Sequence, residues 1–168
     1  HGTRLPDEPL PTLEMALDLI EELGFWANLE MKPHASGPGV LSGIVAQALS
    51  KRPWTHSRVI TSSFILPELR ALRARMPDAP VAVLWDEPPE TWRTEVDALN
   101  AAAIHLNFKH IRQSLVIDAT AHGIDTRVFT INEPSLMERF RDHGLTGVIT
   151  DHPPLFLEDP DWSDWAAS

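Results

Sequence analysis

The sequence predicts an α/β fold in which a parallel sheet is covered by helices. Three observations support this: short apolar runs rich in β-branched residues, amphipathic stretches between them, and even spacing along the 168 residues. Each interval between runs holds one helix and two short loops, the repeating unit of a parallel sheet. We expect strands at 26–31, 58–62, 81–85, 103–107, 127–131 and 147–150.

The intervening helices are marked by apolar residues at helical spacing. In the first helix, Leu13, Leu17 and Leu23 share one face, with Thr12 as N-cap and Gly24 at the C-terminal end. Proline and glycine end or begin several of the others. The remaining helices are expected at 40–49, 66–76, 90–101, 110–122 and 134–143.

The evenly repeated units favour a TIM (β/α)8 barrel over a doubly wound sheet. A doubly wound fold that binds nucleotides carries a glycine-rich phosphate loop after a strand, and the sequence has none. A barrel needs eight units and typically about 250 residues. The chain therefore predicts an incomplete barrel of about six βα units over 1–157, followed by an acidic, tryptophan-containing tail at 158–168.

Composition excludes several classes of function. With 24 acidic and 14 basic residues, the formal net charge is −10, which argues against a nucleic-acid or anionic membrane surface. The chain has no cysteine, so disulfides, thiolate metal sites and cysteine nucleophiles are excluded. Because we find neither an apolar stretch of spanning length nor a targeting segment, we expect no membrane insertion and a cytoplasmic location.

Polar and aromatic residues suited to catalysis or binding lie at the carboxyl ends of the predicted strands, where the active sites of barrels are found. The sharpest pair is Glu30 and Lys32, which point to the same side of an otherwise apolar strand. Their spacing leaves two interpretations: an ion pair at the barrel mouth, or a carboxylate for Mg²⁺ or Ca²⁺ beside a lysine facing phosphate. The other strand ends carry Ser62 and Phe64, Trp85, His105 and Asn107, Thr130 and Asn132, and Thr150 and Asp151.

Five segments, in this order, together resemble the glycerophosphodiester phosphodiesterase family. They are Pro-Thr-Leu-Glu at 11–14, Asn-Leu-Glu-Met-Lys-Pro at 28–33, Ser-Ser-Phe at 62–64, Phe-Thr-Ile-Asn at 129–132 and Gly-Val-Ile-Thr-Asp-His-Pro at 147–153. Their order and spacing are similar to the C-terminal two-thirds of that family. The resemblance runs from about residue 10 to residue 155.

The resemblance implies a TIM barrel that uses a divalent metal, Mg²⁺ or Ca²⁺, to hydrolyse glycerophosphodiesters to glycerol 3-phosphate and an alcohol. It implies that Glu30 is a metal ligand and that Lys32 acts catalytically near the phosphate. It also implies substrate contacts from Lys32, Phe64, Phe129 and Asn132, where Phe129 replaces the family's usual tryptophan.

The family's opening His-Arg-Gly, Glu-x-Asp and His-Asp segments have no match in this sequence. We therefore expect this chain alone to be a poor catalyst, and its open edges to pair with a complementing N-terminal segment or a second copy. His34, His105 and His152 lie near strand ends, but structural roles are the more common explanation for such residues. Two other functions remain open: a non-catalytic phosphate-binding module and a barrel phospholipase.

Overall fold

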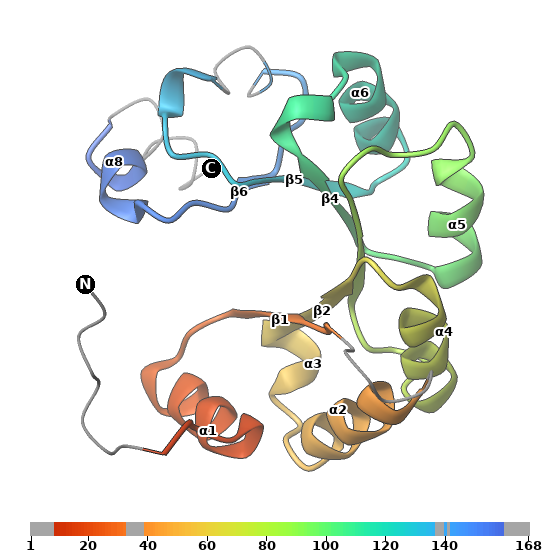
Figure 1. The fold of residues 1–168 in the computed structure, drawn as a ribbon, viewed down its shortest axis with the longest axis vertical. Helices are drawn as coiled ribbons and strands as arrows, with labels where there is room; N and C mark the ends of the chain where they lie inside the picture. Colours follow the sequence, from red (N-terminus) through yellow and green to blue (C-terminus); the bar gives the residue numbers. More distant parts are fainter. Residues whose placement is uncertain (1–8, 33–38, 137–139, 141, 160–168) are drawn as a thin grey trace.

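A computed structural model describes residues 9–32, 39–136, 140 and 142–159 of the chain (Figure 1). Its strands are β1 (Ala27–Glu30), β2 (Val59–Ser63), β3 (Val81–Trp85), β4 (Ala103–Asn107), β5 (Asp125–Phe129) and β6 (Gly147–Val148). Its helices are α1 (Leu13–Leu23), α2 (Val40–Ser50), α3 (Thr55–Arg58), α4 (Leu66–Arg75), α5 (Trp92–Leu99), α6 (Gln113–Ala121) and α8 (Pro153–Leu157). Short 3₁₀ turns, η1 (Phe108–His110) and η2 (Pro134–Leu136), follow β4 and β5.

The six strands form one parallel sheet in chain order, β1-β2-β3-β4-β5-β6. Figure 1 shows the sheet bent into an arc with helices outside it and an opening between its two ends. Six strands are three-quarters of the eight that close such a ring. The prediction of an α/β fold built as an incomplete TIM barrel is confirmed, with β1 and β6 as its edges in the described part of the chain.

Most predicted boundaries agree with the structure, and the exceptions have local causes. The Thr12 hydroxyl accepts from the Met15 amide at 3.2 Å, and Gly24 has a φ of 71°, so α1 begins and ends as expected. β5 lies two residues earlier than predicted, because its pairing partner β4 ends at Asn107, opposite Phe129. The helices α3 and α8 were not predicted, since four or five residues show no periodicity.

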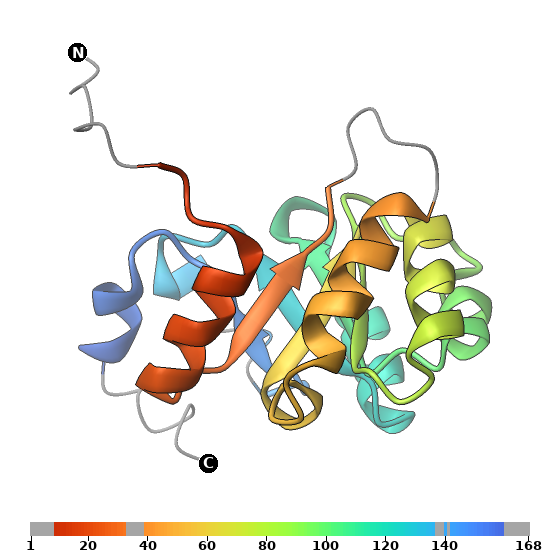
Figure 2. The same cartoon turned by 90° about the horizontal axis from the view of Figure 1, so that it is seen from below.

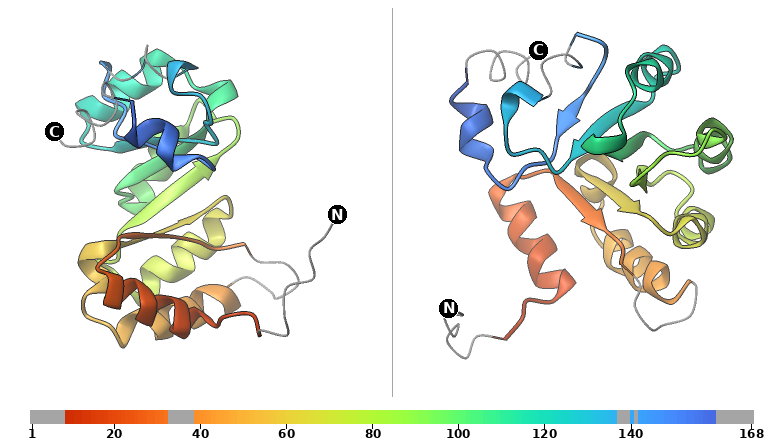
Figure 3. Two further views of the ribbon diagram at one scale, coloured as in Figure 1. Left: turned by 90° about the vertical axis from the view of Figure 1, so that its left-hand side faces the viewer. Right: turned by 45° about the horizontal axis from the view of Figure 1, so that its top comes forward.

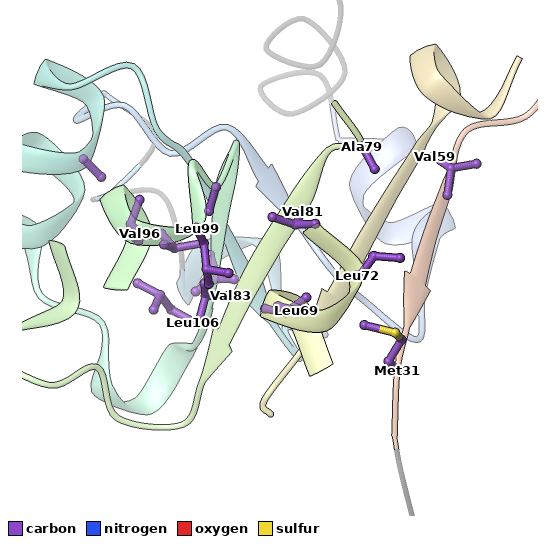
Figure 4. Close-up of a cluster of buried hydrophobic side chains, with 14 of the residues drawn as sticks. Met31, Val59, Leu69, Leu72, Ala79, Val81, Val83, Val96, Leu99 and Leu106 are labelled. Carbon is purple, nitrogen blue, oxygen red and sulfur yellow. The ribbon is translucent and has the colours of Figure 1, made fainter. Parts of the chain in front are cut away.

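The hydrophobic core lies between the sheet and its outer helices. Alternate residues of each strand face those helices, among them Val81 and Val83 of β3, which are fully buried. Figure 4 shows this layer together with Leu69 and Leu72 of α4. Because side chains alternate along a strand, the remaining residues of each strand face the concave side of the arc.

Helices α2, α4, α5 and α6 lie outside the arc in Figure 1, and Figure 2 shows β1 lying between α1 and α2. The right-hand view of Figure 3 shows the next strands of the sheet with their helices on the outer side. None of the described helices is long and apolar enough to cross a membrane. The predicted helix at 134–143 and the tail at 158–168 fall partly outside the described residues.

Candidate active site

Register places the predicted site residues on one side of the sheet. Glu30, the last residue of β1, is the register partner of Ser62, which lies at the carboxyl end of β2. On the far side of the arc, Asn107 of β4 pairs with Phe129 of β5. Register partners in a parallel sheet project from the same face, so these side chains all face the concave side.

Two aromatic residues meet across the mouth of the arc. Phe64 follows β2 and Phe129 ends β5, and their ring centroids lie 5.8 Å apart in an edge-to-face contact at 83°. Two strands, β3 and β4, separate β2 from β5 in the sheet, so the contact spans the concave face. The structure thus brings together two of the residues that the sequence pointed to as substrate contacts.

Glu30 and Lys32 form an ion pair, one of the two interpretations that their spacing left open. The Lys32 Nζ lies 3.3 Å from the Glu30 Oε2, with the lysine side chain 66% exposed and the glutamate side chain 27% exposed. The other carboxylate oxygen, Oε1, is buried and has no hydrogen-bond partner in the described part of the protein. Burying such an oxygen without a partner is costly, so this atom is available to a cation or a donor.

Two further polar side chains, one from β4 and one from β2, are buried inside the arc. His105 of β4 is fully buried, and neither ring nitrogen has a hydrogen-bond partner among the described residues. Burial lowers the pKa of His105 to about 4, helped by the positive charge of Arg127, so its imidazole is neutral at pH 7. The Ser62 hydroxyl is equally buried and also unpartnered there, so no relay to a histidine activates it as a nucleophile.

Asn132, a predicted substrate contact, is held within a network between two loops. Its Oδ1 accepts hydrogen bonds from the Thr150 hydroxyl and the Asp151 amide, each at 3.0 Å. Its Nδ2 donates to the Asp151 carboxylate at 3.2 Å. Asn132 therefore fixes the loop after β6 against the loop after β5, and the side chain of Asp151 shares in that brace.

A matching brace on the other loops was not predicted from the sequence. The Asn107 Nδ2 donates to Asp86 at 3.2 Å, while its Oδ1 accepts from the Lys109 amide at 3.0 Å. The sequence did contain a signal for these braces. One asparagine, Asn107, ends β4 and another, Asn132, follows β5, and each forms hydrogen bonds between neighbouring loops.

The described residues do not hold a complete metal site. No group of three or more histidine, cysteine, aspartate or glutamate side chains is arranged there to bind a metal ion. His34 and the rest of 33–38 lie outside the described residues. Glu30 is thus a single carboxylate with one unpartnered oxygen among the described residues, and oxygen is the ligand type that hard cations prefer.

Comparisons with known proteins find relatives that share this fold. Residues 1–155 match the model of the glycerophosphoryl diester phosphodiesterase family. A glycerophosphodiester phosphodiesterase of Caldanaerobacter subterraneus subsp. tengcongensis is 28% identical over 159 residues, which are 93% of this chain and 64% of that protein. One from Bacillus subtilis is 29% identical over 88% of this chain and 53% of its own length.

A solved structure supports the relationship. The Oleispira antarctica phosphodiesterase in complex with the product sn-glycerol-3-phosphate superimposes with a TM-score of 0.80 at 26% identity, over 94% of this chain and 62% of that one. The chain therefore spans about half to two-thirds of the length of its relatives. With the family match covering most of its residues, this chain belongs to the glycerophosphoryl diester phosphodiesterase family.

Proposed function

We propose that the parent protein of this chain hydrolyses glycerophosphodiesters to glycerol 3-phosphate and an alcohol with a divalent metal, and that this chain supplies part of the active site. The observation that carries the proposal is the pair Glu30 and Lys32 at the C-terminal mouth, with the buried, unpartnered Oε1 of Glu30. Family membership and the product bound to the Oleispira relative support it.

Each residue has a role that its position allows. Glu30 would hold Mg²⁺ or Ca²⁺ through Oε1, and a bound cation would polarise the phosphoryl oxygen. The Lys32 side chain is 66% exposed, so its ammonium has room to turn from Glu30 to the phosphate and offset the negative charge of the phosphate. The edge-to-face pair of Phe64 and Phe129 offers an apolar wall beside them for the glycerol or the alcohol.

His105 is not placed to move a proton to or from a phosphate at the mouth. His105 is neutral and buried, with its nitrogens enclosed inside the arc rather than open to the mouth. We propose that the acid and base, together with the remaining metal ligands, come from the polypeptide that this chain does not span. We also propose that the substrate is a small molecule, that the protein acts in the cytoplasm, and that this chain alone is a poor catalyst.

Release of glycerol 3-phosphate from glycerophosphocholine by the full-length parent tests the proposal, measured with Mg²⁺, with Ca²⁺ and with chelator. Metal-dependent release that chelator abolishes is the expected result. Phosphate-analogue binding without turnover would favour a non-catalytic phosphate-binding module instead. Turnover of phosphoinositides in place of glycerophosphocholine would favour the barrel phospholipase.

A further inference from the structure

Met31 stands between the two site residues of β1, and three contacts hold it. Its amide donates to the Ser62 carbonyl at 2.7 Å. Its side chain is 2% exposed and lies in the hydrophobic cluster that Figure 4 shows. Its carbonyl accepts a hydrogen bond from the Ser63 hydroxyl at 2.8 Å. Because Glu30 and Lys32 directly precede and follow Met31, these contacts also fix the backbone from which both site side chains project.

The same Ser63 hydroxyl makes a second hydrogen bond in the turn that follows β2. Its Oγ accepts from the amide of Ile65, two residues further along the chain, at 3.0 Å. Ile65 immediately precedes α4, and its carbonyl accepts from the amide of Glu68 at 2.9 Å. Phe64 lies between the two residues that this bond joins. The bond therefore holds the backbone from which the Phe64 ring reaches the ring of Phe129.

Burial makes both hydrogen bonds of Ser63 hard to replace. The residue is fully buried, so water is not at hand to substitute for its hydroxyl as donor or acceptor. Ser62, the preceding residue, is equally buried, but its hydroxyl has no hydrogen-bond partner in the described part of the chain. Of the two serines in the Ser-Ser-Phe segment, Ser63 is therefore the one whose side chain links β1 to the turn after β2.

We propose that Ser63 is a positioning residue of the active site, whose hydroxyl ties the end of β1 to the turn after β2. Through these backbone contacts it sets where Glu30, Lys32 and Phe64 stand relative to one another. Side chains alternate along a strand, so Ser63 points away from the concave side and acts without touching the substrate. This role rests on the proposed function, in which Glu30 binds the metal and Lys32 faces the phosphate.

A positioning role differs from a purely structural role in what the loss of the hydroxyl changes. If Ser63 only stabilised the fold, its loss would reduce the fraction of folded molecules and leave each folded molecule as active as before. If Ser63 positions Glu30 and Lys32, folded molecules themselves bind the metal less tightly and turn over more slowly. Displacement of a reacting group by about 1 Å is enough for such an effect.

Amide hydrogen exchange in the full-length parent, without metal or substrate, tests the positioning directly. In Ser63→Ala, the amides of Met31 and Ile65 exchange about tenfold faster than in the wild type, the factor expected for the loss of one hydrogen bond. The amides of β4 keep their wild-type rates, because the change is local. This measurement needs no turnover, so it tests the role of Ser63 even if the proposed function is wrong.

Kinetics of the same variant test the consequence for the site. Ser63→Ala lowers kcat for glycerophosphocholine and raises the half-saturating Mg²⁺ concentration, each by about tenfold, as loss of a group that orients a metal ligand does. A smaller folded fraction alone would leave the half-saturating Mg²⁺ concentration unchanged. Ser63→Thr keeps the hydroxyl and a side chain that suits a strand, so it restores both values.

Thr55→Val is the matched control, because it also removes a buried hydroxyl that donates to backbone carbonyls. Thr55 lies in α3, before β2, and its hydroxyl donates to the carbonyls of Leu49 at 3.2 Å and Arg52 at 2.8 Å. This variant loses stability but keeps the wild-type kcat, half-saturating Mg²⁺ concentration and exchange rate of the Met31 amide. Circular dichroism confirms that each variant is folded.

Three outcomes overturn the proposal. One is wild-type exchange at Met31 and Ile65 in Ser63→Ala, and another is an unchanged half-saturating Mg²⁺ concentration in that variant of an active parent. The third is a shift in Thr55→Val as large as the shift in Ser63→Ala. A wild-type parent without metal-dependent turnover would instead contradict the proposed function, and hydrogen exchange would still decide whether Ser63 positions β1.

Discussion

Glu30 combines two properties that a metal ligand needs, a partly buried carboxylate and an oxygen that no neighbour uses in the described structure. Exchange to glutamine keeps its shape and removes its charge. We predict that Glu30→Gln lowers metal-dependent turnover of the full-length parent by about two orders of magnitude, without unfolding it. The measurement is glycerol 3-phosphate release across a metal titration.

Glu95→Gln is the control for this prediction, since Glu95 pairs with Arg70 on the outer helices and its loss leaves turnover unchanged. A metal titration in Glu30→Gln that matches the wild type would contradict the ligand assignment.

Lys32 differs from Glu30 in acting on the substrate. Because its ammonium is exposed and reaches only one carboxylate oxygen, Lys32→Ala leaves metal affinity close to the wild-type value. Turnover falls by about tenfold or more, since the charge that offsets the phosphate is lost. Parallel measurements of kcat and metal affinity separate the two effects. An equal loss in both would show that Lys32 holds the carboxylate rather than the phosphate.

His105 gives the chain a predictable pH dependence. Its pKa is about 4 in the folded chain and 6.5 ordinarily. Between pH 6.5 and pH 4, His105 is protonated in the unfolded chain and neutral in the folded chain. The free energy of unfolding therefore falls as the pH drops through this range. The full loss is about 3 kcal/mol. His105→Leu removes this loss, and the exposed His110→Asn does not. Urea unfolding at pH 7, 5.5 and 4 measures it, and identical pH profiles for wild type and His105→Leu would refute the assignment.

At the scale of elements, the N-terminus of α2 is held by a side chain from another helix. Glu68 of α4 is 1% exposed and accepts from the amides of Gly39 at 2.7 Å and Ser42 at 3.0 Å. Burial opposes its ionisation, but those hydrogen bonds and the charge of Arg75 outweigh burial, so the pKa of Glu68 is lowered. The carboxylate therefore stabilises the fold above pH 4.5, and its contribution is lost as the pH falls through the lowered pKa.

Removing this cap leaves the buried amide of Ser42 and the partly buried amide of Gly39 without an acceptor. We predict that Glu68→Ala costs about 2–4 kcal/mol of unfolding free energy at pH 7, whereas Glu68→Gln, which keeps one acceptor, costs less. Glu95→Gln, which breaks an exposed pair, costs about 1 kcal/mol or less. Urea denaturation compares the three. Equal losses for Glu68→Ala and Glu95→Gln would show that the cap contributes little.

The same helix shows what sequence could and could not predict. The apolar spacing of 40–49 predicted α2 correctly, and Thr12 and Gly24 predicted both ends of α1, because these signals lie within a few residues of one another. The cap from Glu68 was missed, because 26 positions separate it from Ser42. The position of β5 was missed by two residues, since strand pairing with β4 determined it and local composition did not.

At the scale of the whole molecule, alternation of apolar runs and helices was enough to predict a partial barrel, since each unit repeats the same local pattern. The proximity of Glu30 and Lys32 could likewise be predicted from the sequence, because residues two apart on a strand project from the same face. The contact between Phe64 and Phe129 could not be predicted from the sequence. It depends on the curvature of the sheet, which brings two distant strands together.

The division of the active site between this chain and the rest of its parent is the central claim, and one measurement tests it most directly. Glycerol 3-phosphate release from glycerophosphocholine is compared for the 168-residue chain alone and for the same chain with its preceding polypeptide restored, each with Mg²⁺, Ca²⁺ and chelator. We predict little or no turnover from the chain alone and chelator-sensitive turnover once the polypeptide is restored. Chelator-sensitive turnover by the chain alone, at the rate of the restored protein, would contradict the claim.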